Sequence, residues 1–468
     1  MELHFLRRKR RFGEINMLQG PIFSQLLYFA LPMIATQMLN ILFNAADVAV
    51  VGRFDSGNAM AAVGATTSLI NLLINLSNGI GVGAGILMAR YIGARDYDHA
   101  YRNSHAAAGL ALLLGFAAMI VGFVFSTPIL KMMDTPEDIL EQASLYLRIY
   151  FIGVPASIVY TFCAAALRAS GDSRHSMYYL TAGGVINLLL NLLLVIVLHM
   201  GVAGVAIATV VSKLIAVALI LRHRLKADDI SRLSPKDIHI DLRESWDLFR
   251  VGFPIGLQGC LFNLSNVIIQ STINSFGSAV VAGSTAAVNV NNLSNAVIDG
   301  IYQSSMTFGS QNYGAKNYRR MKKICRTGCG ICAMICIPMG ILITLAGPQL
   351  LGVFVSADDP AYAAIIDAGM HRLRWLGLFV CIHGLMNVLS GMVRAAGRTW
   401  LPMIVTLTGA CALRIVWLNT IFPMQPTLDG LFMSYPITWT ITAAVHLLCF
   451  VLIMHRLQKE KKTAAEPS

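Results

Sequence analysis

Long uninterrupted runs of apolar residues constrain this chain more than any other feature of its sequence. Two examples are Ala106–Phe125 and Met200–Leu221, and each matches the ~20 residues that a helix needs to cross the hydrocarbon core of a bilayer. Only 13% of the residues are charged, against roughly a quarter in a soluble domain. The runs lack the period-two alternation of a membrane β-barrel. They therefore predict an all-α integral membrane protein, because helices satisfy their own backbone hydrogen bonds in lipid.

The positive charges of the chain report its orientation in the membrane. The formal net charge is +12, and the Lys and Arg residues cluster between alternate apolar runs, as in Arg7–Arg11 and Lys316–Arg326. If the N-terminus is cytoplasmic, most of these residues fall in cytoplasmic segments, and the predicted outer loops hold only Arg53 and Lys131. This asymmetry is the positive-inside signature. It predicts a protein of the cell (plasma or inner) membrane whose N- and C-termini are cytoplasmic. We expect it to contact membrane lipids and not to bind nucleic acid.

Charged residues and Gly/Pro breaks divide the chain into twelve predicted transmembrane helices. Their ranges are 22–51, 59–89, 104–127, 144–167, 176–199, 201–222, 251–274, 279–309, 327–355, 372–393, 401–422 and 429–454. The predicted organisation is a cytoplasmic tail (1–20), a six-helix bundle (21–222), a cytoplasmic linker (223–250), a second six-helix bundle (251–457) and a second tail (458–468).

The two halves repeat three short motifs in the same order and at nearly constant offset. Leu31-Pro32 returns as Phe253-Pro254, Gly93-Ala94-Arg95-Asp96-Tyr97 returns as Gly314-Ala315-Lys316-Asn317-Tyr318, and Arg168-Ala169-Ser170-Gly171 returns as Arg394-Ala395-Ala396-Gly397. Because each half has an even number of helices, both enter the membrane from the same side and the repeat is parallel. Repeats that enclose a site are common in secondary transporters, which work by alternating access. A Walker A pattern, which an ATP-driven pump would carry, is absent from the spans.

With these motifs, residues 20–457 resemble the multidrug and toxic compound extrusion (MATE) family. The repeated Leu-Pro opening, the Ala46-Asp47…Val51-Gly52 ending of the first helix, the Gly-Ala-Arg/Lys-x-Tyr loops and the Arg-x-x-Gly loops carry the resemblance. It implies a V-shaped arrangement of two pseudo-twofold-related six-helix bundles. It also implies export of drugs or organic cations in exchange for H⁺ or Na⁺, by a protein that we expect to be monomeric and to need no other cofactor.

A polar stripe on the first predicted helix ends in its one carboxylate, Asp47. Gln37, Asn40 and Asn44 precede it at spacings of three and four residues, which puts all four side chains on one face. A carboxylate within a span costs several kcal/mol unless it is paired or hydrated, so Asp47 is a functional candidate. The amides are either candidates for the substrate cavity or hydrogen-bonding contacts between helices.

Two further helices place polar side chains at a depth that matches Asp47. The hairpin between them turns near Met200–Gly201, so at ~1.5 Å per residue Asn191 and Thr209 lie roughly 12–14 Å below its outer end. Asn187 lies one helical turn deeper, on the face of Asn191. A carboxylate with amide and hydroxyl oxygens suits Na⁺ or an exchangeable proton. The family resemblance implies the same four residues, Asp47, Asn187, Asn191 and Thr209, as the site of the coupling ion.

Two residues near this predicted site depart from the family pattern. Many relatives carry a second acid where this chain has Asn191, so the site has one negative charge fewer. Lys213 lies one turn after Thr209, where it could pair with Asp47 or extend away toward the membrane surface. Both departures leave the choice between H⁺ and Na⁺ open.

The second half carries amides and a histidine where one family branch has acids. Candidates for its substrate cavity or gate are Gln258, Asn263 and Asn266 in the seventh helix. Asp299, His383 and Arg414 lie at similar depths in their helices. They are either three separately satisfied residues or a network that gates the cavity or relays protons, with His383 titrating near neutral pH. Arg394, at a helix end, is expected to bond the last carbonyls or lipid phosphates.

Other classes of function fit the sequence less well. A lipid-linked oligosaccharide flippase of the same superfamily should line its cavity with several cations, and only Lys213 and Arg414 are clearly within predicted spans. An intramembrane enzyme needs a nucleophile and base or a metal cluster at one depth, and a channel needs a filter-like loop. We predict no catalytic residues and no metal site. The cysteines Cys325, Cys329, Cys332 and Cys336 recur at helical spacing, and we interpret them as packing residues.

Overall fold

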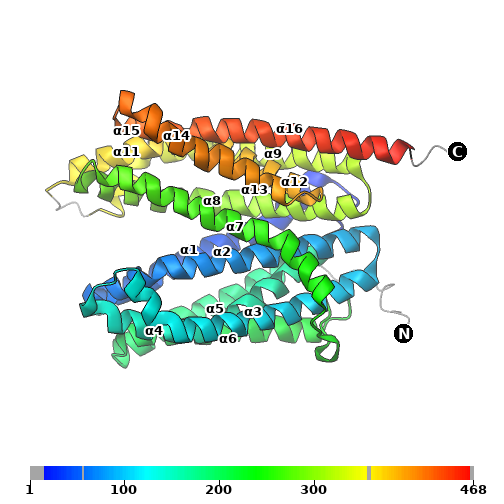
Figure 1. Ribbon diagram of the computed structural model, residues 1–468, viewed down its shortest axis with the longest axis horizontal. Helices are drawn as coiled ribbons and strands as arrows, with labels where there is room; N and C mark the ends of the chain where they lie inside the picture. Colours follow the sequence, from blue (N-terminus) through cyan, green and yellow to red (C-terminus); the bar gives the residue numbers. More distant parts are fainter. Residues whose placement is uncertain (1–14, 55–56, 356–359, 464–468) are drawn as a thin grey trace. The chain divides into compact units, whose positions relative to one another are not determined.

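The computed structural model describes residues 15–54, 57–355 and 360–463, and within these ranges all regular structure is helical (Figure 1). The chain forms two compact units. Unit 1 contains residues up to Asn16 together with Ala35–Gly256, and unit 2 contains Met17–Ile34 together with the chain from Leu257 onward.

The elements of unit 1 follow one another with short connections. They are the second part of α1 (Ile22–Phe54), α2 (Gly57–Ala94), α3 (Tyr97–Met132), α4 (Glu137–Ser170), α5 (Arg174–Asn191), the π-helical turn η2 (Leu192–Val197), α6 (Gly201–Leu225), the 3₁₀ turn η3 (Pro235–Asp237) and the first part of α7 (Leu242–Asn274). Helix α4 packs against α2, α3 and α6, and its buried face supplies much of the apolar core of this unit.

Unit 2 repeats this plan with more interrupted helices. Its elements are the first part of α1, the second part of α7, α8 (Ser278–Gly314), α9 (Tyr318–Leu345), α10 (Gly347–Gly352), α11 (Tyr362–Leu378), α12 (Val380–Ala395), α13 (Trp400–Thr406), the π-helical turn η4 (Leu407–Ala412), α14 (Leu413–Thr420), the 3₁₀ turn η5 (Phe422–Met424), α15 (Leu428–Phe432) and α16 (Ser434–Thr463). Helix α12 packs against α8, α9 and α16.

Ten described helical segments are long and apolar enough to cross a membrane, or eleven if α11 and α12, which meet at a bend of 48°, form one span. Helix α8, which is more polar, occupies the range of the predicted span 279–309. Several predicted borders were wrong: α7 begins at Leu242, α9 at Tyr318 and α11 at Tyr362. The prediction ended helices at charged residues, but backbone hydrogen bonds continue through such residues wherever the helix extends past the hydrocarbon core.

The repeated prolines lie where α1 and α7 each pass from one unit to the other. Pro32 lies just before the division between Ile34 and Ala35, and Pro254 lies just before the division between Gly256 and Leu257. A proline inside a helix removes a backbone hydrogen bond and favours a kink. In unit 2, the first part of α1 is fixed by α8, since Phe29 meets Phe308 edge-on at 5.6 Å and Asn312 donates to the Met17 carbonyl oxygen at 3.0 Å.

The repeated loops have the same backbone form in both units. Arg95 and Lys316 adopt positive φ values of 61° and 52°, and the next residue caps the following helix. Asp96 accepts from the backbone N–H of His99 at 3.2 Å, and Asn317 accepts from that of Arg320 at 3.2 Å. The repeat found in the sequence is therefore also a repeat of turn geometry.

The first part of α7 approaches α2 closely within unit 1 because both helices carry glycines there. A Cβ added at Gly79 would lie 2.1 Å from the backbone nitrogen of Gly256, and one added at Gly83 would lie 2.5 Å from the Cα of Gly252. The backbones are thus in direct contact, as is common where membrane helices pack through small residues.

We expect Gly79→Val to destabilise the protein, because its side chain must push the α7 backbone away. The cost of such overpacking is about 1–3 kcal/mol. Gly64→Ala in the same helix is the control, because a Cβ there meets nothing within 4 Å, and it should be neutral or stabilise slightly. Thermal unfolding in detergent measures both, and an unchanged melting temperature for Gly79→Val would contradict the close contact.

We expect Asp96→Ala to destabilise α3 by about 0.5–2 kcal/mol, the usual cost of a lost N-cap. Asp96→Asn should preserve the cap, since Asn317 does the same in unit 2. Burial opposes the effect, but hydrogen bonds from the His99 ring and backbone lower the pKa of Asp96 below its ordinary 3.8. Its contribution should therefore persist at neutral pH and be lost only as acid protonates the carboxyl. Unfolding of the two variants at neutral and acidic pH provides the measurement.

Candidate functional site

The four residues predicted to hold the coupling ion lie together in unit 1, and we refer to Asp47, Asn187, Asn191 and Thr209 as the Asp47 cluster. The Asn191 amide donates to the Asp47 carboxylate and also lies 3.3 Å from the Asn187 carbonyl oxygen. Asn187 in turn donates to the Thr209 hydroxyl at 3.5 Å. The cluster therefore joins α1, α5 and α6 through one chain of side-chain hydrogen bonds.

The cluster is largely buried but leaves one acceptor unused. Asn191 is fully buried, and Asn187 is 5% exposed. The Asn191 side-chain oxygen has no hydrogen-bond partner among the described residues. The π-helical turn η2 begins directly after Asn191, and π-helical turns frequently occur at functional sites. Asn191 thus lies where α5 changes its hydrogen-bond register, beside the only carboxylate of the cluster.

Lys213 is held by helix α4. Its ammonium donates to the Ser157 hydroxyl at 3.1 Å and the Tyr150 hydroxyl at 3.4 Å, and it lies 5.1 Å from the centre of the Tyr150 ring. The ion pairs found among the described residues include none between Lys213 and Asp47, although the lysine acts on that carboxylate through space.

The other polar residues of the first helix form a looser group. Asn40 donates to the Gln37 side chain at 3.4 Å, which fits two residues on one face of a helix. Asn44 is exposed. Their predicted part in a substrate cavity stays a prediction.

Unit 2 contains a pocket of about 390 Å³ whose lining mixes amides, aromatic rings and one guanidinium, and which we call the unit-2 pocket. Its lining residues are Phe262, Asn266, Val267, Ile269, Gln270, Ile273, Val288, Asn291, Asn292, Ser294, Asn295, Arg372, Leu376, Val380, His383, Tyr435 and Trp439. Among the described residues, none that line this pocket is an aspartate or a glutamate. The predicted candidates Asn266 and His383 are part of it.

His383 and Arg414 are linked through two aromatic rings. His383 stacks on Trp439 with ring centres 4.7 Å apart, Trp439 meets Tyr435 edge-on at 5.6 Å, and the Arg414 guanidinium lies 3.9 Å from the centre of the Tyr435 ring. The pair predicted from depth therefore shares one aromatic cluster. The part of Asp299 in a network stays a prediction.

Two buried arginines of unit 2 escaped the sequence reasoning. Arg372, which lines the pocket, stood at the start of a predicted span, but α11 begins ten residues earlier at Tyr362. Arg394 was expected to contact carbonyls or lipid phosphates. It is buried, donates to the Gln258 side chain at 2.5 Å and to the Tyr302 hydroxyl. Arg372 was missed because the prediction used charged residues to set the helix borders. The environment of Arg394 was missed because the sequence does not show that its side chain points inward.

The three candidates of the seventh helix have different surroundings. Gln258 accepts from Arg394, which makes it a structural partner of that arginine. Asn263 is exposed, and Asn266 reaches the unit-2 pocket.

Comparison with known proteins gives one consistent result. The family model MatE matches residues 32–193 and 254–419, one stretch in each half. The chain is 28% identical over 404 residues to the probable multidrug resistance protein YpnP of Bacillus subtilis, covering 85% of this chain and 87% of that protein. It is 22% identical over 454 residues to the multidrug export protein MepA of Staphylococcus saprophyticus, covering 96% and 98%.

Solved structures agree on the fold. An outward-facing multidrug resistance MATE family transporter of the MOP superfamily superposes with a TM-score of 0.90 at 23% identity, covering 96% of this chain and all of the other. A MOP superfamily transporter from Pyrococcus furiosus, described as having a binding pocket of reverse polarity, gives 0.89 at 23% identity with the same coverage.

The family match over both halves defines this polytopic helical protein as a membrane transporter. The chain belongs to the MatE family, the multidrug and toxic compound extrusion transporters. The predicted twelve-helix fold of that family is confirmed.

If His383 relays protons, His383→Gln should reduce transport and weaken its dependence on pH. Glutamine keeps polar atoms in the pocket but cannot take up a proton. His455→Gln on the exposed end of α16 is the control. Initial transport rates across a pH series give the measurement, and an unchanged profile would remove His383 from any proton relay.

Proposed function

We propose that this protein exports small molecules, drugs or organic cations among them, by alternating access and in exchange for H⁺. Relatives named as multidrug export or multidrug resistance proteins support the export of drugs. The parallel repeat supports alternating access. The distribution of Lys and Arg supports a cell-membrane protein with cytoplasmic termini, and we propose that it acts as a monomer.

The observation that carries this proposal is the Asp47 cluster, in which one carboxylate lies among neutral amide and hydroxyl groups. Protonation removes the single negative charge of the cluster. It also turns a group that only accepts hydrogen bonds into one that donates. The Asn191 oxygen, which lacks a donor, is an acceptor that such a proton could use after the amide turns.

The orientation of the amides favours H⁺ over Na⁺ as the coupling ion. Asn191 directs its N–H groups at the Asp47 carboxylate and at the Asn187 oxygen, and Asn187 directs its N–H at Thr209, so the amide that meets Asp47 presents a donor and not an oxygen. A hard cation needs several oxygens around one point. The Lys213 ammonium, which acts on Asp47 through space, would also repel a bound Na⁺, whereas a protonated carboxyl is neutral.

The proposed cycle follows from these contacts. Asp47 takes up a proton from the outer side, the hydrogen bond from Asn191 rearranges, and α1 shifts relative to α5. This change favours release of substrate outside and return to the inward-facing state. Loss of the proton restores the bond and prepares the site for another substrate. Protonation of one buried group would thus bias a two-state element.

We expect Asp47→Asn to abolish the effect of a pH gradient on efflux, lowering the driven rate by about tenfold or more. The assay is efflux of ethidium from proteoliposomes under an imposed pH gradient or an imposed Na⁺ gradient. Asp138→Asn, at an exposed carboxylate in the first turn of α4, is the matched control and should behave as wild type.

Each other result has a definite meaning in this assay. Efflux driven by the Na⁺ gradient alone would show that the coupling ion is Na⁺ and not H⁺. Efflux driven by neither gradient would overturn the antiport proposal. An equal loss in Asp138→Asn and Asp47→Asn would show that the effect does not come from the cluster.

A second candidate function is the flipping of a lipid-linked oligosaccharide, and Arg372 in the unit-2 pocket favours it. A pyrophosphate headgroup needs cations along its path, and this residue adds one to those visible in the sequence. Flipping of a fluorescent lipid pyrophosphate in the same proteoliposomes, lost in Arg372→Gln, would support this candidate over drug export.

A further inference from the structure

The unit-2 pocket holds four buried hydrogen-bond donors that lack a partner among the described residues. They are Arg372 Nε, Asn291 Nδ2, Trp439 Nε1 and the Ser294 hydroxyl. A buried donor without a hydrogen-bond partner destabilises the folded protein, and a charged donor does so more strongly. Four of them around one pocket indicate that a ligand with several acceptors completes the set.

The pocket also carries positive charge, which favours the same kind of ligand as its hydrogen-bond donors. Arg372 is 9% exposed, donates to the Ser284 hydroxyl at 2.5 Å and lies 5.6 Å from the centre of the Phe432 ring. The centre of the Tyr435 ring lies 6.0 Å from this guanidinium and 3.9 Å from that of Arg414. Two buried cations thus share one aromatic ring, with no carboxylate in the pocket lining to balance them.

A buried cation without a counter-ion is costly, and Arg414 adds to that cost. It is fully buried, and its Nε and Nη1 atoms have no hydrogen-bond partner in the described ranges. Its one described hydrogen bond is a 3.4 Å contact with the Thr438 hydroxyl. An anionic ligand in the pocket would supply both the missing acceptors and the missing negative charge.

We propose that the unit-2 pocket binds an aromatic or apolar molecule that carries an anionic, acceptor-rich group such as a carboxylate. Arg372 and the donors of Asn291 and Ser294 hold the anionic group, and the Tyr435 and Trp439 rings face the apolar part. This substrate class rests on the proposed transport function, and it departs from a transporter that carries only organic cations.

The test is direct binding to the purified full-length protein in detergent, so it does not depend on transport. Isothermal titration compares 1-naphthoate with 1-naphthylmethylammonium, which share a ring system and differ in charge. We expect naphthoate to bind about tenfold tighter or more, since a hydrogen bond to a charged group is stronger than one between neutral groups. Arg372→Gln should remove this preference, and Arg326→Gln, at an exposed arginine of α9, should preserve it.

Equal binding of the two probes, a preference for the ammonium, or no binding of either would overturn the proposal. A naphthoate preference that survives Arg372→Gln would also overturn it, because the guanidinium would then not hold the anion. Arg372→Lys keeps the charge and should retain part of the preference, which separates charge from loss of folding. Because the binding assay uses no ion gradient, a failure of gradient coupling in the efflux assay can be told from a failure of this pocket.

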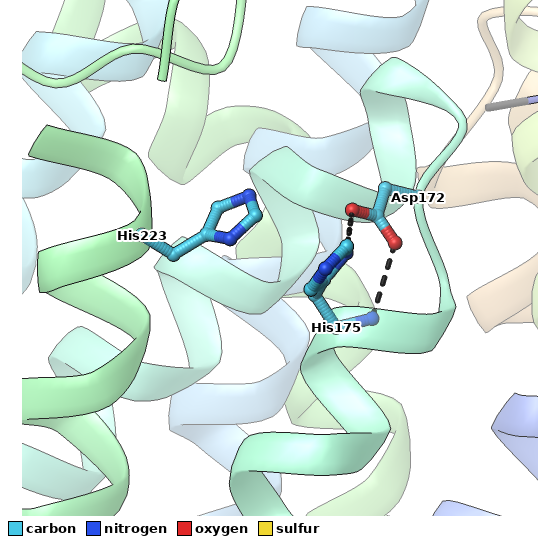
Figure 2. Close-up of side chains that lie close together, drawn as sticks. All are labelled: Asp172, His175 and His223. Carbon is cyan, nitrogen blue, oxygen red and sulfur yellow. Dashed lines mark hydrogen bonds and ion pairs between the residues drawn. The ribbon is translucent and has the colours of Figure 1, made fainter. Parts of the chain in front are cut away.

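A different observation concerns the ends of α5 and α6 that are predicted to be cytoplasmic. Asp172, His175 and His223 each offer a ligand atom within 4.8 Å of the others (Figure 2). Asp172 Oδ1 accepts from the backbone N–H groups of Arg174 and His175, each at 3.1 Å, so the start of α5 fixes its position. Its other oxygen lies 2.5 Å from His175 Nδ1.

His223 faces this pair from the last turn of α6. Its ring centre lies 4.4 Å from that of His175, and its Nδ1 lies 2.8 Å from the Tyr179 hydroxyl. Histidines that bind metals commonly use one nitrogen for the ion while an outer partner orients the other. Arg222 and Lys226 line the adjacent pocket with His223, so their charges weaken the affinity of this site for a dication.

We infer that Asp172, His175 and His223 bind a divalent transition metal of the Zn²⁺ type, a site that the sequence had not suggested. Two imidazoles and a carboxylate suit Zn²⁺ or Co²⁺, and His223 Nε2 is assigned to the ion. The ion would join the ends of α5 and α6, the helices that carry Asn187, Asn191 and Thr209 of the Asp47 cluster. It could therefore restrict the movement of that cluster.

Zn²⁺ titration of protein purified without a histidine tag tests this site. We expect one bound ion, a higher melting temperature with Zn²⁺, and about tenfold or greater loss of affinity in His175→Ala and His223→Ala. Asp172→Asn keeps the backbone cap and should also weaken binding. His371→Ala is the control, because His371 lies 2.9 Å from Asp429 and 3.9 Å from Asp367 without a second imidazole in that set.

Co²⁺ absorption distinguishes the ligands. The proposed site should give bands of nitrogen and oxygen ligands without the thiolate charge-transfer band that the Cys325–Cys336 set would produce. A thiolate band, the absence of binding, or equal affinity in wild type and the two histidine variants would overturn the proposal.

Discussion

The hydrocarbon core of a membrane offers no hydrogen bonds, and the rest of this structure depends on that constraint. Each described span satisfies its backbone as a helix, and the helices can approach closely where Gly79 and Gly83 meet the α7 backbone. The same rule applies to side chains. Asp47 obeys it through the Asn191 amide, whereas Arg372 and Asn291 leave donors unused. We propose that the unused donors of the unit-2 pocket bind a ligand and that the Asp47 cluster exchanges a proton.

The two units share a backbone plan but have opposite polar chemistry. Unit 1 places a single carboxylate among neutral amides, with Lys213 held apart by α4 hydroxyls. Unit 2 places guanidinium groups among aromatic rings, with no acid in its pocket lining. A duplicated scaffold thus keeps its turns, as the matching φ values of Arg95 and Lys316 show, while its interior diverges. In our proposals one unit exchanges a small positive ion and the other holds a negatively charged group, so ion and substrate need not compete for one residue.

The sequence alone predicted the fold and the members of the Asp47 cluster, because hydropathy, repeat order and helical depth are local properties of the chain. Counting residues from the α5–α6 turn was enough to bring Asn191 and Thr209 to one level. The sequence did not reveal Arg372 as a pocket residue. Its charge was used to set the start of a predicted helix, so it was not considered as a buried functional group. The aromatic link between His383 and Arg414 needed side-chain directions that residue spacing does not give. The prolines were recognised as a repeat, but their place at the division of α1 and α7 required the contacts themselves.

That division of α1 and α7 has a consequence for how the protein is made. The segment Met17–Ile34 leaves the ribosome early, yet it belongs to unit 2, whose other residues begin at Leu257. Unit 1 likewise lacks its last part until the start of α7 has been synthesised. More than half of the chain must therefore be synthesised before the first part of α1 can contact the rest of unit 2.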